Sequence, residues 1–192
     1  MCGRYVFWND EPDDELQRIV YDLSEQYPTW TAGENGEIAP TQQAPVLTGP
    51  LTVRLFSWGY PAYRGGKVLI NARCETAAYK PTFQQSLYRR RCLIVSTGYF
   101  EWSAAKTRYL FRKPKGGALY LAGLYENLSP HEGRFVILTT QATGRAGQIH
   151  SRMPLLVDEV NRQNWLENTA FAMRYLDAAK TAPEPQLTIE SY

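Results

Sequence analysis

The feature of this chain that most restricts its fold is a series of four apolar runs between residues 92 and 140. The runs are rich in β-branched and aromatic residues, and turn sequences such as Lys115-Gly116-Gly117 separate them. This alternation of apolar runs and turns predicts several β-strands in succession. The runs are Cys92–Trp102, Tyr109–Arg112, Ala118–Tyr125 and Phe135–Thr140.

Patterns typical of helices flank these strands at both ends of the chain. Leu16, Ile19 and Leu23 recur at helical spacing behind an acidic segment, as on the buried face of an amphipathic helix. Two further helices are predicted at 158–167 and 169–178, whereas most of 31–50 is predicted as loop and the tail from 181 as irregular. Together these elements predict an α+β fold with a curved antiparallel β-sheet or barrel-like core and flanking helices.

The chain has 192 residues, which favours one domain over residues 1–192. No segment approaches the roughly 18 apolar residues of a membrane span, and the first residues lack the apolar core of a secretory signal. We therefore expect a soluble, cytoplasmic protein. Lys and Arg number 21 against 19 Asp and Glu, a net charge of +2. This balance neither indicates nor excludes a nucleic-acid-binding protein, because a binding groove needs only local basicity.

Cysteine and histidine are too few and too widely spaced for a structural metal site. The cysteines are Cys2, Cys74 and Cys92, no C-x-x-C pair occurs, and His131 and His150 are far apart. We expect reduced thiols, no disulfide framework and no metal. No Walker or Rossmann glycine-rich loop occurs, so nothing in the sequence requires a cofactor. His131 lies in a segment typical of a surface turn, and we assign it no role.

Cys2 directly follows Met1, and an initiator methionine is normally removed before a small residue. Removal leaves an α-amine and a thiol on one residue. The α-amine has a reference pKa of about 7.7–8, so part of it is neutral near pH 7 and can attack an aldehyde to form a Schiff base. The thiol can then close on the same carbon to give a thiazolidine, an intramolecular step that proximity favours. The alternative is a frayed terminus with an incidental cysteine.

Two further residues are candidates for proton transfer. Glu101 lies between large aromatic side chains in the segment Gly98–Trp102, where burial would raise its pKa toward the range of a general acid or base. The alternative is a solvent-facing or arginine-paired carboxylate. Histidine exchanges protons near neutral pH, which makes His150 a second candidate, and its alternative is a hydrogen-bonded structural histidine.

Arginine recurs two residues away from three candidate reactive groups. In extended backbone such neighbours point to one side, so each arginine would lie beside its partner. Asn71 could orient a nucleophile, and the arginines could hold the phosphates of a polyanion. The alternative is that Asn71 and the arginines are ordinary surface residues. The Trp58 side chain could stack on a nucleic-acid base, or it could pack in the hydrophobic core. The pairs are Arg4 with Cys2, Arg73 with Asn71 and Arg152 with His150.

Six segments, in this order, resemble the motifs of the SRAP family, the SOS response-associated peptidase proteins. The segments span about residues 1–157, and residues 158–192 add the C-terminal helices and tail. The resemblance implies a single SRAP domain. The segments are Met1–Tyr5, Ala39–Gln42, Trp58-Gly59, Asn71–Thr76, Gly98–Trp102 and Ile149–Pro154.

The resemblance implies a protein that binds single-stranded DNA and crosslinks to abasic sites, whose open sugar carries an aldehyde. Cys2 would form a thiazolidine that shields the lesion, and Asn71 would position its amine. Glu101 and His150 would move protons in this lyase-like Schiff-base chemistry. We expect a monomer, associated with the nucleoid when bound to DNA or nuclear in a eukaryote. The implied DNA contacts are phosphate contacts by Arg4, Arg73, Arg152 and Thr139, and base or sugar contacts by Trp58 and Pro40.

Other functions use the same residues. The family's peptidase name reflects removal of its own N-terminal residues, so Cys2, Glu101 and His150 could drive self-processing. A thiol peptidase acting on other proteins is one alternative, but it gives no reason for three arginines at the site. The other is a non-covalent single-stranded DNA-binding module, whose binding would weaken steeply with salt and would not survive denaturation.

Overall fold

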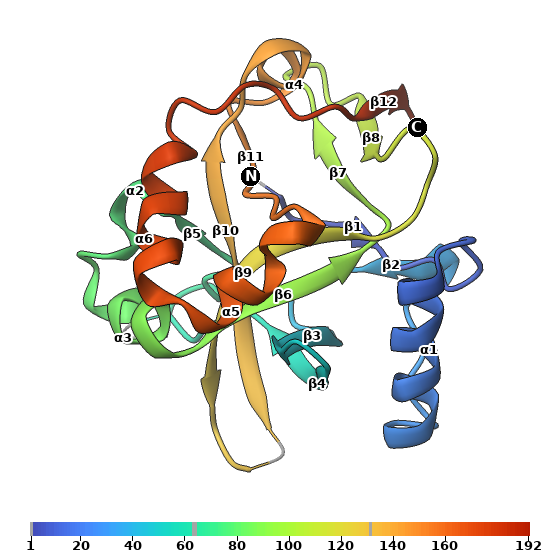
Figure 1. The fold of residues 1–192 in the computed structure, drawn as a ribbon. Coiled ribbons are helices and arrows are strands. Elements are labelled where there is room, and N and C mark those ends of the chain that lie inside the picture. The colour runs from blue at the N-terminus through green and yellow to red at the C-terminus, as the bar shows by residue number, and fades with distance from the viewer. Residues whose placement is uncertain (1, 63–64, 131) are drawn as a thin grey trace.

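The computed structural model describes residues 2–62, 65–130 and 132–192, so the predictions about Met1 and His131 lie outside the described residues. Within this part of the chain two β-sheets are flanked by helices (Figure 1), which confirms the α+β class. The α-helices are α1 (Asp14–Gln26), α2 (Cys74–Ala77), α3 (Pro81–Arg89), α4 (Gly144–Ile149), α5 (Arg162–Glu167) and α6 (Thr169–Ala178), and short 3-10 turns are η1 (Glu34–Gly36) and η2 (Glu159–Asn161). The strands are β1 (Tyr5–Val6), β2 (Glu37–Ile38), β3 (Gln43–Gly49), β4 (Thr52–Trp58), β5 (Asn71–Arg73), β6 (Arg91–Ser96), β7 (Gly98–Trp102), β8 (Arg108–Arg112), β9 (Leu119–Asn127), β10 (Gly133–Gln141), β11 (Arg152–Pro154) and β12 (Thr188–Ser191).

The larger sheet closes on itself. Its strands pair in the order β11-β10-β4-β3-β6-β9, and β9 also pairs with β10. The strands β10, β4, β3, β6 and β9 therefore form a closed circuit, as the predicted barrel-like core requires. The sheet is not wholly antiparallel as predicted, because β10 runs parallel to β4 and to β5. A parallel pair needs a long crossover connection, and long stretches of chain separate these strands.

The smaller sheet has the order β12-β8-β7-β1-β2, and the chain passes into it directly from barrel strand β6. The sequence predicted one strand over Cys92–Trp102, but the chain leaves the barrel at Thr97. Gly98 permits this corner, because a Cβ atom there would lie 2.9 Å from the carbonyl oxygen of Phe111, closer than side chains tolerate. The Ser96 hydroxyl bonds both the N–H and the carbonyl of Gly98, at 3.1 and 2.8 Å.

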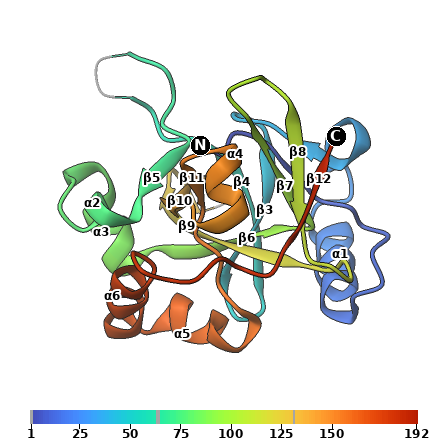
Figure 2. The same cartoon turned by 90° about the horizontal axis from the view of Figure 1, so that it is seen from above.

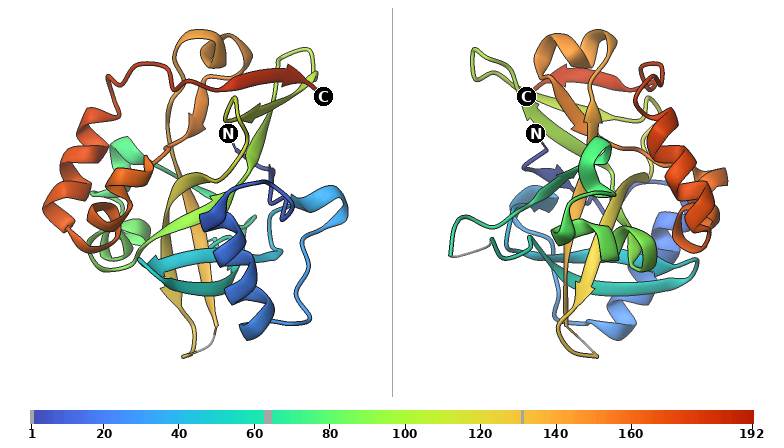
Figure 3. Two further views of the ribbon diagram at one scale, coloured as in Figure 1. Left: turned by 45° about the vertical axis from the view of Figure 1, so that its right-hand side comes forward. Right: turned by 90° about the vertical axis from the view of Figure 1, so that its left-hand side faces the viewer.

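The N-terminal helix α1 forms as its sequence predicts. The Asp13 side chain caps it by accepting a hydrogen bond from the Leu16 N–H at 2.9 Å. Leu16, Ile19 and Leu23 form its buried face. It lies apart from α2, α3, α5 and α6, which gather on another side of the molecule (Figure 1, Figure 3). None of the helices among the described residues combines the length and the apolar composition that crossing a bilayer requires.

Three strands, β2, β3 and β12, lie in segments for which the sequence predicts loop or irregular structure. β2 has only two residues and pairs with β1. β3 occupies much of the second half of 31–50, and its Ala44, Val46 and Leu47 side chains are buried. β12 lies in the C-terminal tail and pairs with β8. Pro45 interrupts the strand pattern of β3, and β12 is only four residues long. All three strands are stabilised by partners elsewhere in the chain, which local propensity does not report.

A buried arginine connects the helices to the barrel. Arg91, the first residue of β6, is 4% exposed, and its guanidinium donates to carbonyls near the C-terminal ends of two helices. In α3, Leu87 and Tyr88 accept at 2.8 and 3.1 Å; in α5, Trp165 and Leu166 accept at 2.6 and 3.0 Å. The last carbonyls of a helix lack partners within it and attract positive charge. One side chain therefore caps both helices.

Candidate active site

Strand β10 brings several of the predicted site residues together. Along one edge it pairs with β4 and then β5, and along the other with β9 and then β11. The β5 pairing places Asn71 and Arg73 beside β10, with Arg73 opposite Thr139, and β11 begins with Arg152. In Figure 2 the N-terminal end of the chain is drawn close to β5, β10, β11 and α4. Segments far apart in the sequence thus meet at one end of β10.

Cys2 lies three residues before the start of β1, and its side chain is fully buried, which is unlike a frayed terminus. Asn71 Nδ2 donates a hydrogen bond to the Cys2 carbonyl oxygen at 2.8 Å, so β5 holds this residue in place. The thiol lies 3.9 Å from the carbonyl oxygen of Arg4. Burial raises the pKa of the Cys2 thiol, and the negative charge of Glu101 raises it further. The thiol is therefore protonated at rest.

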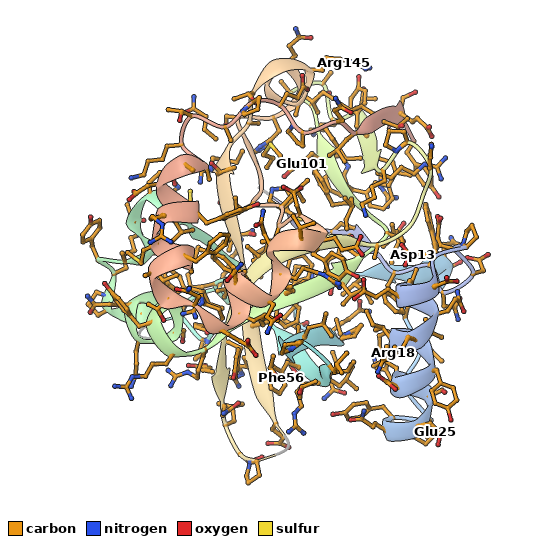
Figure 4. All side chains as sticks on the ribbon, in the orientation of Figure 1. Asp13, Arg18, Glu25, Phe56, Glu101 and Arg145 are labelled. Atoms are coloured by element: carbon orange, nitrogen blue, oxygen red, sulfur yellow. The ribbon has the colours of Figure 1, made fainter. Side chains whose placement is uncertain are left out.

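Glu101 extends from β7 into the same region and is labelled in Figure 4. It is 2% exposed, and its Oε2 lies 3.9 Å from Nδ1 of His150. Burial raises the pKa of Glu101, and the charge of protonated His150 acts in the opposite direction. His150 follows α4, and its Nδ1 lies 3.0 Å from the amide nitrogen and 3.1 Å from the carbonyl oxygen of Arg152, so the backbone of Arg152 holds the ring in place. A buried carboxylate thus faces a histidine whose ring orientation is fixed by the backbone.

Arg152 is held by the carboxylate of Glu75, a residue that no sequence pattern singles out for a role. Its guanidinium forms a bidentate ion pair with Glu75, with N–O distances of 2.5 and 2.9 Å. It also donates to the carbonyl oxygen and the hydroxyl of Thr139, at 2.5 and 3.2 Å. Hydrogen bonding to Arg152 lowers the pKa of Glu75. Thr139 is fully buried, so in this structure it supports Arg152 and is not accessible to a phosphate.

Arg4 belongs to a second ion-pair cluster. Its Nη1 lies 3.2 Å from Glu37, which also binds Arg108 at 2.5 Å. The Arg108 guanidinium lies over the ring of Phe100, 3.5 Å from the centroid. Phe100 precedes Glu101 in β7, and successive side chains of a strand point to opposite faces. This cluster therefore lies across the smaller sheet from Glu101, and no motif of the sequence pointed to Glu37 or Arg108.

The other predicted DNA contacts differ in their exposure. Trp58 is fully buried, donates its indole N–H to the Ile70 carbonyl at 2.9 Å, and stacks on Phe135 with centroids 6.2 Å apart. Core packing, rather than base stacking, describes Trp58 in this structure. Pro40 is half-buried and Arg73 is exposed, so a DNA strand could reach both.

The cysteines do not form a disulfide or a metal site. All three are free and buried: Cys2, Cys74 and Cys92. Within residues 2–62, 65–130 and 132–192, no group of three or more His, Cys, Asp or Glu side chains could hold a metal ion. Among the predicted catalytic residues, the side chains that can exchange protons or act as nucleophiles are the Cys2 thiol, the Glu101 carboxylate and the His150 imidazole.

We expect Glu101→Gln to raise the melting temperature more at about pH 7 than at about pH 4. Because burial raises the pKa of Glu101, the folded protein binds more protons than the unfolded chain between the two pKa values. The stability of the folded protein therefore falls as the pH rises from the ordinary pKa of glutamate toward the raised pKa of Glu101 in the folded state. A neutral glutamine at this position removes this loss of stability. Thermal melts across this pH range measure the difference. Glu25→Gln, at an exposed position on α1, is the control, and equal pH profiles for the two variants would contradict the prediction.

Comparison with known families and proteins gives one family over nearly the whole chain. The family model described as SOS response associated peptidase (SRAP) matches residues 1–191. Abasic site processing protein YoaM of Bacillus subtilis (strain 168) is 30% identical over 194 residues, covering 93% of this chain and 84% of its own. Abasic site processing protein YedK of Escherichia coli (strain K12) is 30% identical over 179 residues, covering 86% and 79%.

Solved structures share the fold. A protein from Bacteroides thetaiotaomicron superposes with a TM-score of 0.76 at 20% identity, covering 99% of this chain and 91% of its own. A protein from Bordetella bronchiseptica gives 0.75 at 20% identity, covering 100% and 99%. At this level of identity the likeness supports the architecture alone.

Proposed function

This chain belongs to the SOS response-associated peptidase (SRAP) family, and on that premise we propose that it captures abasic sites in single-stranded DNA covalently. The two relatives described above, each 30% identical in sequence to this chain, are named abasic site processing proteins. The observation that carries the proposal is the meeting of Cys2 with Asn71, Glu101 and His150. An N-terminal aminothiol reacts with aldehydes, and the open form of an abasic sugar is an aldehyde.

The reaction begins once Met1 has been removed. The α-amine of Cys2 attacks the aldehyde carbon, water leaves, and a Schiff base forms. The thiol then adds to the same carbon and closes a thiazolidine. Asn71 fixes the Cys2 carbonyl and with it the direction of the amine. Glu101, whose pKa burial raises, exchanges protons with the amine, the leaving water and the thiol, and His150 relays them.

The raised pKa of the Cys2 thiol favours covalent capture of abasic sites over the activity of a general thiol peptidase. Catalytic cysteines of peptidases are activated by a lowered pKa, so that a thiolate is ready to attack. Burial and Glu101 act in the opposite direction and raise the pKa of Cys2. In thiazolidine formation the amine attacks first, and the thiol needs to lose its proton only when the ring closes.

The exposed Arg73 supplies a test of the DNA contacts. We expect Arg73→Glu to weaken the binding of an undamaged single-stranded oligonucleotide by about tenfold at low salt. Its melting temperature should not change, because the side chain is exposed and forms no ion pair within the described residues. Fluorescence anisotropy against Arg18→Glu on α1 measures the effect. Equal losses in the two variants would assign the effect to net charge and remove Arg73 from the binding site.

A denaturing gel tests the proposed function itself. The protein, shown by intact mass to have lost Met1, is mixed with a single-stranded oligonucleotide carrying one abasic site. An undamaged oligonucleotide and one with a sugar analogue lacking the aldehyde serve as controls. We expect a heat-stable shifted band with the abasic strand alone. No band from folded, Met1-free protein would reject capture, and binding that is lost on denaturation would indicate a non-covalent module.

A further inference from the structure

Two buried tyrosine hydroxyls near Cys2 have no hydrogen-bond partner within the described part of the chain. Tyr5 and Tyr99 are both 0% exposed, and the hydroxyl oxygen of each is buried and unpartnered. Leaving a buried hydroxyl without a partner destabilises a protein, so such groups are rare. Two of them in adjacent strands beside a reactive cysteine indicate a role in the reaction.

The strands fix the position of both phenols. Tyr5 in β1 and Tyr99 in β7 are direct partners across the β1–β7 pairing. The Tyr5 ring packs on Trp58 with centroids 5.3 Å apart, and the Tyr99 ring stacks on Phe111 at 4.7 Å. The rings are therefore held by core packing, while the hydroxyls remain available for another acceptor.

The backbone also places the thiol of Cys2 beside β7. The carbonyl oxygen of Arg4 accepts the Phe100 N–H at 2.9 Å, and the Cys2 thiol lies 3.9 Å from that oxygen. Tyr99 and Glu101 flank Phe100, and both project to the face opposite to it. The Cys2 sulfur also interacts electrostatically with Glu101 and with Tyr99, so the thiol lies near the side of the smaller sheet that these two residues share.

The electrostatics of the phenols agree with this placement. Burial raises the pKa of Tyr5 and of Tyr99, and a negative charge on the Cys2 sulfur raises the pKa of both further. Both phenols thus keep their protons at neutral pH. A protonated phenol with no acceptor is a suitable hydrogen-bond donor to an anion that forms beside it.

We propose that Tyr5 and Tyr99 donate hydrogen bonds to the sulfur of Cys2 as its thiol closes the thiazolidine ring. This inference rests on the proposed function. In the step the S–H proton passes to the Glu101 carboxylate, and a sulfur electron pair forms the C–S bond to the Schiff-base carbon. The C=N π pair returns to nitrogen, which neutralises the protonated Schiff base, so no oxidant or co-reactant is needed. Donors aimed at the sulfur stabilise its developing charge where water is excluded.

The variants Tyr5→Phe and Tyr99→Phe remove the hydroxyls and keep the rings. We expect each to slow ring closure by about 10- to 100-fold, the loss typical of a hydrogen bond to a charged group. Since no protein partner is lost, we expect the melting temperature to stay the same or to rise by about 2–4 °C. A purely structural hydroxyl predicts the reverse, a lower melting temperature and normal chemistry.

The experiment separates Schiff-base formation from ring closure. Met1-free protein reacts with a single-stranded oligonucleotide carrying one abasic site, and samples are quenched over time with borohydride. Borohydride reduces the Schiff base to a stable amine but leaves the thiazolidine unchanged, so intact mass resolves the two adducts. We expect the variants to form the Schiff base at the wild-type rate and the thiazolidine more slowly. The control is Tyr60→Phe, whose buried hydroxyl donates to Ser86 at 3.2 Å, and which should lose stability but close the ring normally.

Each other outcome has a distinct meaning. Ring closure at the wild-type rate in both variants overturns this inference and leaves covalent capture intact. A lowered melting temperature with slow formation of both adducts assigns the hydroxyls to stability and also overturns it. Absence of any adduct in the wild type rejects the proposed function itself.

Discussion

Replacing Cys2 with alanine abolishes the heat-stable adduct with an abasic oligonucleotide. The variant still carries an N-terminal amine after Met1 is removed, so it can form a Schiff base, but it has no thiol to close the ring. A Schiff base hydrolyses when the protein is denatured, so the shifted band is lost. Borohydride added before denaturation should restore a band, because reduction makes the amine linkage permanent.

A second cysteine supplies the matched control for this variant. Cys92 is also free and 0% exposed, but it lies in barrel strand β6. Cys92→Ala removes the same buried sulfur, at a cost of about 1 kcal/mol or more for the cavity, and should keep the adduct. Melting temperatures show that both variants fold. A Cys2→Ala protein that crosslinks as well as the wild type would rule out thiazolidine formation.

Replacing Arg91 with methionine lowers the free energy of unfolding by about 3–5 kcal/mol, the loss expected when several buried oxygen acceptors lose the one charged donor that they share. The guanidinium is the donor to carbonyls that end α3 and α5, and it also bonds the Thr169 hydroxyl at 3.1 Å. Methionine fills similar volume but leaves these buried acceptors without donors.

Urea denaturation followed by circular dichroism measures the loss. Arg89→Met removes the same charge at an exposed position two residues earlier and should change stability by less than about 0.5 kcal/mol. Equal midpoints for the two variants would show that the carbonyls find other donors, and that the arginine does not fasten the helices to the barrel.

The sequence predicts those parts of the fold whose determinants are local. Helix α1 combines a cap at Asp13 with apolar residues at helical spacing, and helix α6 coincides with its predicted range Thr169–Ala178. Strand β12 depends on pairing with β8, and the corner at Thr97 depends on how closely β8 approaches Gly98. Such features arise from contacts between distant segments, so no window of sequence contains them.

In the candidate site, too, features that depend on neighbouring residues could be predicted from the sequence, and features that depend on tertiary contacts could not. The aromatic neighbours of Glu101 indicated burial and a raised pKa as one of two alternatives, and the structure selects this one over a solvent-facing or arginine-paired carboxylate. The partners of the arginines were not predictable, because Glu75 and Glu37 reach Arg152 and Arg4 across the tertiary structure. Base stacking by Trp58 was one of two open alternatives, and only the three-dimensional packing places that ring in the core.

Because β10 pairs with other strands of the candidate site, the site around Cys2 can assemble only after most of the polypeptide has been synthesised. Cys2 leaves the ribosome before any other part of the site, whereas β10, α4 and β11 are made after most of the chain. Native contacts between such distant segments form late in folding. A nascent or truncated chain that ends before α4 lacks His150, Arg152 and the strand β11 that pairs with the edge of β10. If the proposed function is correct, the aminothiol of Cys2 is therefore joined by the groups that guide its reaction only when the polypeptide is nearly full length.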